Sequence, residues 1–401
     1  MGSSTDRRYN YHQIVMRTYF RYSIFIAALI SLASCEKPTS VQDTWGDVNV
    51  PLDPSKHYIH FDADITTKGA LVEGNVLLDD FSVLGYQYPG TWEAEKVFAK
   101  PNVFDNTPQI VTYEKELGIF SYGTPKVWTG NRYSFFGYYP SNHSNIKLFD
   151  GNGTKQGDPY ILYDLPHSSD PTALIDIMTA AYIDTGVASS ASVPMPFRHR
   201  LCAIDVGARN YYEYNHDNNG TTPEKLVTIE IVNLEVNLTN VTSTSAKIYL
   251  DHTIPTELNY SNPKASITYK IVDKDAEWAV PSFDVEPNTA SDRAIRLVKK
   301  KTGENASSLL LLPQKDLLQG ALKLTYKKKY LNDNNEWVYI HEGDNVNDFE
   351  FNPDLVIKFS KELIEGRRYY IELTFTSDAV SVNVIAADEW NTLPDVKYEF
   401  E

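Results

Sequence analysis

Histidine is the side chain most often used for metal binding and acid–base catalysis, and nine histidines are spread along this sequence. His57 and His60 are three residues apart in a segment with strand-like alternation, so their side chains point to opposite faces. His199, within residues 197–201, has no nearby partner, and we expect a hydrogen-bonded strand histidine. The spacing of the histidines therefore does not indicate a metal centre.

Other patterns resemble chemical sites only in part. Residues 118–123 are one residue out of register for a nucleophile elbow, and no strand–helix context surrounds them. Residues 150–158 begin like a calcium loop, but Lys155 stands where an EF-hand needs Gly and Ile161 where it needs Glu. Two carboxylate pairs are typical of an acidic surface: Glu93 with Glu95, and Asp62 with Asp64. With no Gly-rich phosphate loop, the sequence predicts neither an enzyme nor a cofactor.

Tryptophan side chains can form flat surfaces on which sugar rings stack. Six occur here, at positions 45, 92, 128, 278, 337 and 390. Such residues more often lie in a core or an interface, because one end of the indole is apolar and the other carries a polar N–H group. Both interpretations stay open.

A cysteine stands at the end of a secretory-type leader. Four arginines precede or flank an apolar run at residues 23–33, which is too short for a transmembrane helix and suits a signal peptide. The run ends in Leu-Ala-Ser-Cys35, which is similar to the lipobox of bacterial lipoproteins. That resemblance implies a signal peptide over residues 1–34 and acylation of Cys35, which would anchor the chain in a membrane. The alternative is a buried N-terminal helix with a chance cysteine.

Length and charge limit the number of domains and the kinds of binding partner. Removing residues 1–34 leaves 367 of 401 residues, which at roughly 150 per domain suggests two domains. The leader carries four Arg and one Asp, so the remaining chain has a formal charge near −19 instead of −16. This charge argues against nucleic acid and anionic lipid as partners. If Cys35 is acylated, Cys202 is alone and reads as a small core residue, so stability must come from core burial.

Short strands separated by turn residues run through the rest of the chain. They are expected at residues 57–65, 81–88, 108–113, 126–128, 132–139, 197–206, 226–238, 246–250, 265–272, 294–299, 308–312, 321–331, 336–341, 369–376 and 379–386. One short helix is expected after Asp170, with Pro171 at its first position. A shift of apolar phase predicts a bulge near Asn233, and residues 332–335 read as a hairpin turn. Many short strands favour β-sandwiches.

The domain organisation follows from these elements. We expect a tether at residues 35–55, an N-terminal domain at 56–190 and a C-terminal domain at 191–401, with residues 187–196 as the linker. A weak internal repeat supports two related domains, because the pattern Gly-x-x-Tyr occurs twice: at Gly130 to Tyr133 and at Gly366 to Tyr369.

Several motifs in a fixed order then resemble a known family. They are the lipobox, Tyr-Ser-Phe-Phe-Gly-Tyr-Tyr-Pro at 133–140, Asp-Ile-Met-Thr-Ala at 176–180, Phe-Arg-His-Arg-Leu at 197–201, Leu-Leu-Leu-Pro-Gln at 310–314, Gly366-x-x-Tyr369 and Trp390. The ordered set is similar to the fimbrillin family, the subunits of type V pili of anaerobic Gram-negative bacteria.

The resemblance implies an all-β fold of two transthyretin-like Greek-key β-sandwich domains in tandem, with the strand at Phe197 opening the second. It also implies export as an outer membrane lipoprotein, trimming by a surface protease at a basic residue, and assembly with other pilus subunits by strand exchange into a fimbrium. The chain departs from the family at the trimming step. No Arg lies between Cys35 and Arg132, so an Arg-specific protease would have no site there.

A lysine is therefore the expected cleavage position. Lys68 follows the strand-like segment 57–65 and precedes Gly69, which makes the site flexible and accessible. Lys37 and Lys56 are the rivals. The alternative is an ordinary loop at a strand end.

The C-terminus is the candidate donor strand. Two extended pieces alternate apolar with polar residues, and Pro394 separates them. The apolar positions are Val380, Val382, Val384, Val396, Tyr398 and Phe400. The alternative is that the last piece is simply the final strand of its own domain.

Two functions from different classes follow. The first is a pilus subunit, in the stalk or at the tip, and a tip would bind a host protein or glycan. The second is a surface lipoprotein that does not polymerise and binds glycans through exposed Trp and Tyr side chains. A lysine cut followed by fibres supports the first, and a retained lipid with sugar binding supports the second.

Overall fold

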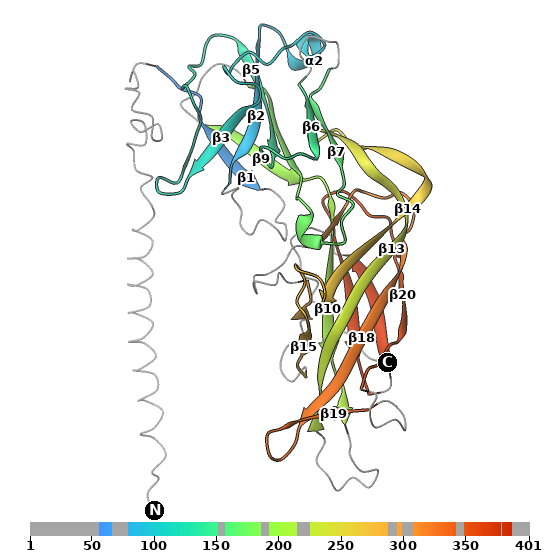
Figure 1. The fold of residues 1–401 in the computed structure, drawn as a ribbon. Helices are drawn as coiled ribbons and strands as arrows, with labels where there is room; N and C mark the ends of the chain where they lie inside the picture. Colours follow the sequence, from blue (N-terminus) through green and yellow to red (C-terminus); the bar gives the residue numbers. More distant parts are fainter. Residues whose placement is uncertain are drawn as a thin grey trace, which may run out of the picture. The chain divides into compact units, whose positions relative to one another are not determined.

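The computed structural model describes residues 56–65, 79–150, 157–185, 192–214, 225–287, 295–298, 308–341, 349–377 and 379–386. These residues form nearly continuous β-structure (Figure 1), which confirms the all-β, β-sandwich class. Helical structure in these ranges is limited to α2 (Trp92–Glu95) and the 3-10 turn η2 (Pro171–Ala173). Within the same ranges, no helix is long and apolar enough to cross a membrane.

The first sheet has seven strands. Their order is β1 (Phe61–Ile65), β9 (Val193–His199), β8 (Met178–Thr185), β5 (Arg132–Tyr139), β2 (Phe81–Tyr88), β3 (Gln109–Glu114) and β4 (Ile119–Ser121). β2 and β5 have the bounds expected from the sequence. Nearly every residue in these two strands is buried, because both faces of the sheet are covered.

The two ends of this sheet approach each other. Tyr122, directly after β4, donates its hydroxyl to the carbonyl of Ile59, directly before β1, at 2.8 Å. The Ile59 N–H in turn donates to the carbonyl of Lys126 at 2.8 Å. The sheet therefore curls around the side chains on one of its faces, and the edge strand β1 lies where the curl closes.

Two further sheets build the rest of the chain. A five-stranded sheet has the order β16 (Ile295–Arg296), β10 (Cys202–Asn210), β21 (Arg368–Phe375) and β22 (Val380–Ala386), with β17 (Leu309–Leu311) paired to β10. An eight-stranded sheet has the order β19 (Trp337–Ile340), β18 (Gln319–Leu331), β13 (Thr228–Tyr249), β7 (Tyr160–Asp164) and β6 (Ile146–Phe149), with β14 (Glu257–Asp273) and β15 (Phe283–Val285) paired to β13, and β20 (Asp354–Lys358) to β18. β11 (Glu213–Tyr214) and β12 (Lys225–Leu226) form a separate pair.

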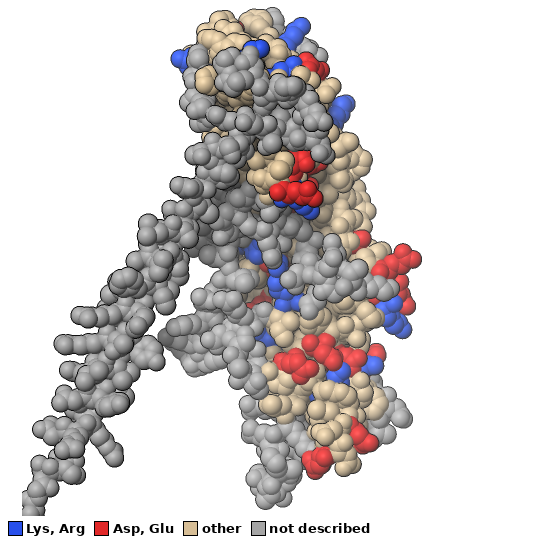
Figure 2. All heavy atoms as spheres, turned by 90° about the vertical axis from the view of Figure 1, so that its left-hand side faces the viewer, with Lys and Arg blue, Asp and Glu red and all other residues tan. Residues whose placement is uncertain are grey.

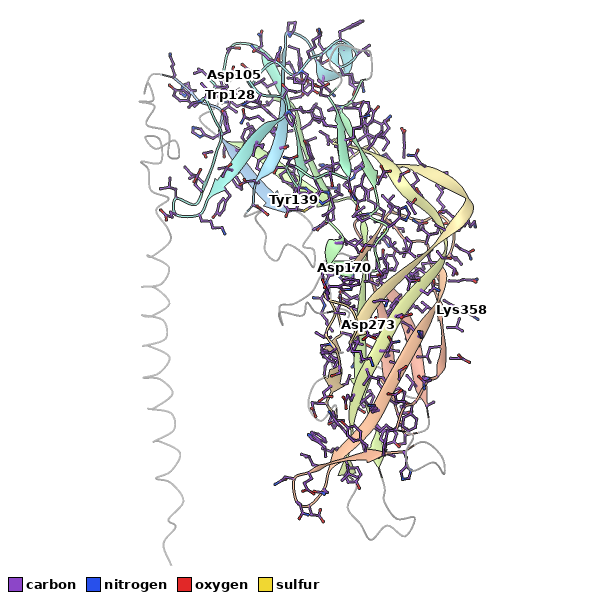
Figure 3. The ribbon with its side chains drawn as sticks, in the orientation of Figure 1. Asp105, Trp128, Tyr139, Asp170, Asp273 and Lys358 are labelled. Carbon is purple, nitrogen blue, oxygen red and sulfur yellow. The ribbon has the colours of Figure 1, made fainter. Side chains whose placement is uncertain are left out.

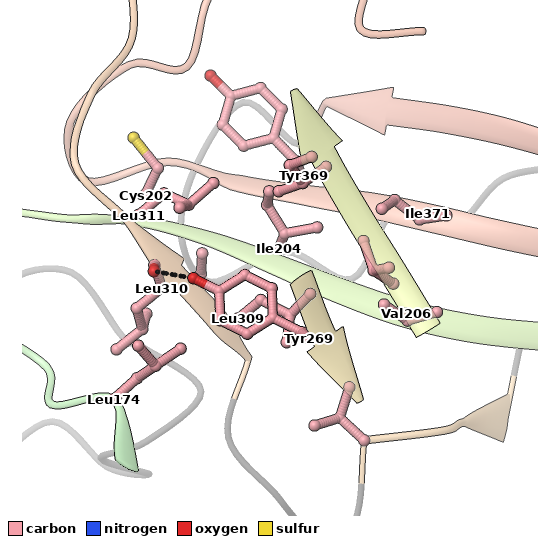
Figure 4. Close-up of a cluster of buried hydrophobic side chains, with 14 of the residues drawn as sticks. Leu174, Cys202, Ile204, Val206, Tyr269, Leu309, Leu310, Leu311, Tyr369 and Ile371 are labelled. Carbon is pink, nitrogen blue, oxygen red and sulfur yellow. Dashed lines mark hydrogen bonds between the residues drawn. The ribbon is translucent and has the colours of Figure 1, made fainter. Parts of the chain in front are cut away.

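The five-stranded and eight-stranded sheets share one core, as expected of a β-sandwich. Ile204 and Ile371 from the first sheet lie in the same buried cluster as Tyr269 from β14. Tyr269 donates its hydroxyl to the carbonyl of Leu310 at 3.4 Å (Figure 4), so its polar tip is satisfied inside the apolar cluster. Cys202 is fully buried beside them, which confirms its reading as a core residue.

Local features that the sequence predicts are present. The pairing of β13 with β18 shifts register between Ile231 and Asn233, which confirms the bulge. At η2, the side chain of Asp170 accepts the N–H of Thr172 at 2.7 Å, which confirms the capped start before Pro171.

The repeated Gly-x-x-Tyr pattern has the same structural role twice. Tyr133 and Tyr369 are each the second residue of a mostly buried strand, β5 and β21. The hydroxyl of Tyr133 accepts the N–H of Thr129 at 2.9 Å, and that of Tyr369 accepts the N–H of Ile364 at 2.8 Å. Each tyrosine therefore pins the turn that precedes its strand, as a tyrosine corner does.

The expectations for residues 187–206 are wrong in part. Residues 193–196 are not linker, because they begin β9. The expected strand at 197–206 is two strands, β9 and β10, with a break at residues 200 and 201. Since β9 pairs with β1 and β8, the strand that carries Phe197 belongs to the seven-stranded sheet. Its expected role as the first strand of a second domain stays a prediction. The domain bounds 56–190 and 191–401, and the tandem transthyretin-like arrangement, stay predictions.

Candidate assembly site

β1 fills a groove lined by aromatic side chains. The ring of Phe61 lies 5.5 Å from that of Phe135, 5.7 Å from that of Tyr122, and 6.2 Å from those of Phe81 and Phe104, measured between centroids. Edge-to-face packing at such distances stabilises aromatic clusters beyond simple burial. Phe61 is therefore the anchor of this segment.

The side chains of the segment alternate as the sequence predicts. Ile59, Phe61 and Ala63 are all buried, whereas Asp62 is exposed and His60 is half-buried. A strand with one buried and one open face is the pattern that alternation favours. The groove therefore receives three consecutive inward side chains.

The main chain of β1 has a strand partner on one side only. It runs parallel to β9, with Phe61 opposite Val193 and Ile65 opposite Phe197, and it lies at the end of its sheet. The N–H of Val193 also donates to the carbonyl of His60 at 2.7 Å. Among the described residues, β1 is therefore an edge strand with one strand partner. The residues just before it are held on the other side, where Tyr58 forms a bridge with Val127 and the Trp128 N–H donates to the carbonyl of His57 at 2.9 Å.

The expected processing residues lie around this strand. Lys68 follows the last residue of β1, Ile65, by three positions and lies outside the described residues, as do Cys35 and Lys37. Lys56 is exposed at the beginning of the first described range. The signal peptide at 1–34 and the tether at 35–55 also lie outside the described residues.

The first part of the candidate donor is β22, an edge strand of the five-stranded sheet. It pairs antiparallel with β21 from Phe375 opposite Val380 to Tyr369 opposite Ala386. Val380, Val382 and Val384 are half-buried and pack against the core cluster, whereas Ser381 and Asn383 are exposed. The predicted alternation is therefore present. The second part, with Val396, Tyr398 and Phe400, lies outside the described residues.

Two of the sequence motifs meet where β8 begins and β9 ends. Met178 and Thr179 pair with His199 and Arg198. Asp176 and His199 are both buried, and their side chains contact through Oδ2 and Nδ1 at 2.7 Å. His199 is therefore a buried strand histidine in contact with a carboxylate, and the hydrogen bond expected from the sequence stays a prediction.

The sequence did not predict an ion pair beside these motifs, between buried Arg200 and half-buried Glu365. The Nε of Arg200 lies 2.8 Å from Oε1 of Glu365, and its Nη2 donates to the carbonyl of Ile254 at 2.9 Å. Thr256 also donates its hydroxyl to Glu365 at 2.6 Å. The available signal was an arginine next to a run of apolar residues, which needs a carboxylate partner when buried.

Three aspartates in different parts of the chain have structural roles. In Figure 3, the labelled Asp105, Asp170 and Asp273 lie on different parts of the described chain. Asp105 pairs with Lys126 at 2.7 Å, and Asp273 pairs with Lys270 at 2.7 Å. In the part of the chain that the structure describes, no three His, Cys, Asp or Glu side chains are grouped to hold a metal ion.

Comparisons with known proteins bear on this arrangement. No curated protein matches the sequence. The fold is similar to that of a fimbrial protein from Bacteroides vulgatus, with a TM-score of 0.54 and 16% identity over 83% of this chain and 99% of that one. A candidate cell adhesion protein from Bacteroides ovatus is 14% identical, with a TM-score of 0.45 over 84% of this chain and 99% of that one.

At these identities the similarity to the Bacteroides vulgatus protein shows the fold alone. The sequence itself carries the stronger finding, because a family model described as fimbrillin-like matches residues 77–390. That match covers well over half of the 401 residues. The chain therefore belongs to the fimbrillin-like family.

Proposed function

We propose that this chain is a structural or adhesive subunit of a bacterial surface pilus, and not an enzyme. It is exported as an outer membrane lipoprotein acylated at Cys35, trimmed by a protease, and polymerised with itself or related subunits by strand exchange. The family match and the fimbrial neighbour support a pilus or adhesin subunit. The observation that carries the assembly step is β1, an N-terminal edge strand seated in an aromatic groove.

Trimming after Lys68 is the step that activates the subunit. The cut removes residues 35–68, and with them β1 and the lipid anchor. Removal of β1 uncovers the rings of Phe81, Phe104 and Phe135 and leaves one edge of β9 without its partner. An exposed groove with unpaired backbone groups is a template for an added strand.

A neighbouring subunit supplies that strand from its C-terminus. Residues 391–401 could reach roughly 35 Å at about 3.3 Å per residue, which is enough to run along a sandwich. Val396, Tyr398 and Phe400 alternate with polar residues, so they offer three apolar side chains to replace Ile59, Phe61 and Ala63. Main-chain hydrogen bonds supply affinity, and the side-chain positions set the register.

The role of β22 in donation differs from that of the last residues. Val380, Val382 and Val384 already pack against the core of their own sandwich, and every residue of β22 is paired with β21. Donating this strand as well would break that pairing. We therefore assign the first contact with a neighbour to Val396, Tyr398 and Phe400, and β22 joins the donor only if it detaches.

N-terminal sequencing and intact-mass analysis of protein sheared from cells test this function. We expect fibres whose subunits begin at Gly69. Lys68→Gln should retain the uncut chain on the membrane and abolish fibres, whereas the matched variants Lys56→Gln and Lys37→Gln should assemble normally. Fibres whose subunits still begin at Cys35 would contradict the proposal and favour a surface lipoprotein without this activation step.

A further inference from the structure

We propose that the hairpin of β18 and β19 is a binding surface for neutral glycans, with Trp337 as the residue on which a sugar ring stacks. This inference rests on the surface location proposed above, but it does not depend on polymerisation. It gives the subunit an adhesive surface on a sheet other than the one that contains β1.

Trp337 differs from the other described tryptophans. Its side chain is 46% exposed, whereas Trp92 is buried and Trp128 and Trp278 are half-buried. Among the described residues, no protein acceptor receives its indole N–H. An exposed indole with an available donor is typical of binding surfaces, where an aromatic ring and a polar group act together.

The indole ring is fixed in place from one side. The Nζ of Lys329 lies over the Trp337 ring, 5.0 Å from its centroid. That ammonium is itself held by both carboxylate oxygens of Asp284 at 2.8 Å and by Glu230 at 3.4 Å. Because one lysine can cover only one ring face and the side chain is nearly half exposed, the other face is open. Such preorganisation lowers the entropy lost on binding.

Two exposed side chains extend this surface. Leu331 lies opposite Trp337 across the hairpin, and Tyr339 is two residues along the same strand, so all three share a face. Tyr339 donates its hydroxyl to Glu230 at 2.8 Å, which orients its ring. The result is an apolar surface wide enough for more than one ring, with a carboxylate at its side.

The turn beside Trp337 is also ordered by its own contacts. The side-chain oxygen of Asn332 accepts the N–H groups of Asn334 and Glu336, both at 2.9 Å. The Asn332 amide nitrogen donates to the Glu336 carboxylate at 3.2 Å. Asn334 and Asn335 remain exposed beside the indole, and their amides can exchange hydrogen bonds with sugar hydroxyls.

The chemistry of the surface selects the ligand. The face of an aromatic ring is electron-rich, so it attracts the C–H groups that cover one face of β-linked glucose or galactose. Acidic side chains surround the site, including Glu230, Asp284 and Glu336. Of the two lysines that lie over its rings, Lys329 is paired with Glu230 and Asp284, and Lys327, 6.0 Å from the centroid of the Tyr339 ring, is paired with Glu350 at 3.7 Å. Figure 2 shows acidic side chains toward the lower end of the face drawn, the end at which β19 lies in Figure 1. Repulsion by these carboxylates therefore disfavours sialylated and sulfated glycans.

Saturation-transfer NMR and titration with lactose and cellobiose test the proposal on the full chain, purified in a detergent without a sugar headgroup. We expect binding of at least one of these sugars, strongest saturation at the axial ring protons of one sugar face, and weaker binding of sialyllactose. Because the chain is unassembled, this result is independent of whether it forms pili. Failure to bind either neutral sugar, or tighter binding of sialyllactose, would overturn the proposal.

Variants identify the residue. Trp337→Ala should weaken binding at least about tenfold, and Trp337→Phe should restore part of the affinity. Tyr260 is a matched control, since it is 55% exposed and also lies near a lysine, Lys315, at 5.5 Å. Tyr260→Ala should bind sugar normally. Equal losses of sugar affinity in Trp337→Ala and Tyr260→Ala would show that the surface is not a glycan site. The same conclusion would follow if Trp337→Ala weakened contacts with another protein while the natural chain bound no sugar.

Discussion

At the scale of single residues, a substitution in the ion pair of Arg200 and Glu365 should destabilise the fold. The Arg200 side chain is fully buried and contacts Glu365, Ile254 and Thr256. Removing one partner of a buried pair leaves the other uncompensated, so Arg200→Met should lower the free energy of unfolding by about 3–5 kcal/mol. Urea unfolding measures this loss. Arg198→Met is the control, because Arg198 is exposed in the same motif and its loss should cost less than about 0.5 kcal/mol.

The same variant should make stability depend on pH. Burial raises the pKa of the Glu365 carboxyl, and the Arg200 guanidinium opposes that rise. Without Arg200, the folded chain binds a proton at Glu365 more tightly than the unfolded chain does, so its stability falls as pH rises through the carboxyl range. The difference between Arg200→Met and the natural chain should therefore be larger at pH 8 than at pH 5. An equal difference at both pH values would show that Glu365 is hydrated in the variant.

The two cysteines separate a lipid anchor from a core residue. Burial and the nearby Glu365 raise the pKa of the Cys202 thiol, so it is an unreactive core group. Metabolic labelling with a fatty-acid analogue should therefore mark only Cys35. Cys35→Ala should lose the label and Cys202→Ala should keep it, since the chain has no third cysteine. Label that persists in Cys35→Ala would contradict the lipoprotein assignment.

At the scale of elements, β1 should behave as a separable strand. A synthetic peptide of residues 56–65 should rebind a chain that begins at Gly69 and raise its melting temperature, because the groove is built by residues outside the peptide. Phe61→Ala in the peptide should cost about 3–5 kcal/mol of binding, as expected for a deleted core aromatic. Asp62→Ala should cost only about 1 kcal/mol, since Asp62 is exposed and loses one hydrogen bond, from the hydroxyl of Ser192. If the chain that begins at Gly69 folds but does not bind the natural peptide, this result would argue against an acceptor groove.

Strands with strong local patterns could be predicted, and β9 shows why others could not. β2 and β5 are rich in aromatic residues and end in turn signals, so their bounds follow from the sequence. β9 contains Pro194 and Pro196, which favour a linker. In the structure the N–H of Val193 donates toward β1, so the backbone nitrogens of Pro194 and Pro196 point toward β8. β8 pairs with β9 only at Arg198 and His199. The missing N–H groups are therefore not needed there.

The groove itself could be predicted only in part. Alternation in residues 57–65 identifies the inward side chains of Ile59, Phe61 and Ala63. Their partners Phe104 and Tyr122 lie outside the named strands and reach Phe61 only because the sheet curls. No local pattern encodes such a contact. The helix α2 was missed for a similar reason, because its four residues are fixed by Trp92 donating its N–H to Asp184 at 2.7 Å.

At the scale of the whole molecule, the proposed acceptor and the proposed donor lie in different parts of the chain. The proposed acceptor groove belongs to the seven-stranded sheet near the N-terminus, whereas the proposed donor follows the last described strand, β22, in the sequence. A contact between two different surfaces repeats from subunit to subunit and gives a filament instead of a closed dimer. The formal charge of −16 on the full chain opposes close approach, so assembly should depend on directed strand contacts more than on general attraction.

A truncation that ends at Asn391 tests this polarity. Trimmed at the N-terminus, such a subunit keeps the groove and lacks Val396, Tyr398 and Phe400, so it should accept a full-length neighbour but not donate to one. Alone it should stay monomeric on gels, and mixed with trimmed full-length subunits it should terminate their ladders. Tyr398→Asp with Phe400→Asp should act like the truncation, because charged side chains are costly to bury in an aromatic groove. Glu399→Gln should assemble normally, because position 399 lies between the apolar positions in the alternating sequence. Unchanged ladders from the truncated subunit alone would show that residues 396–400 are the last strand of their own domain and not the donor.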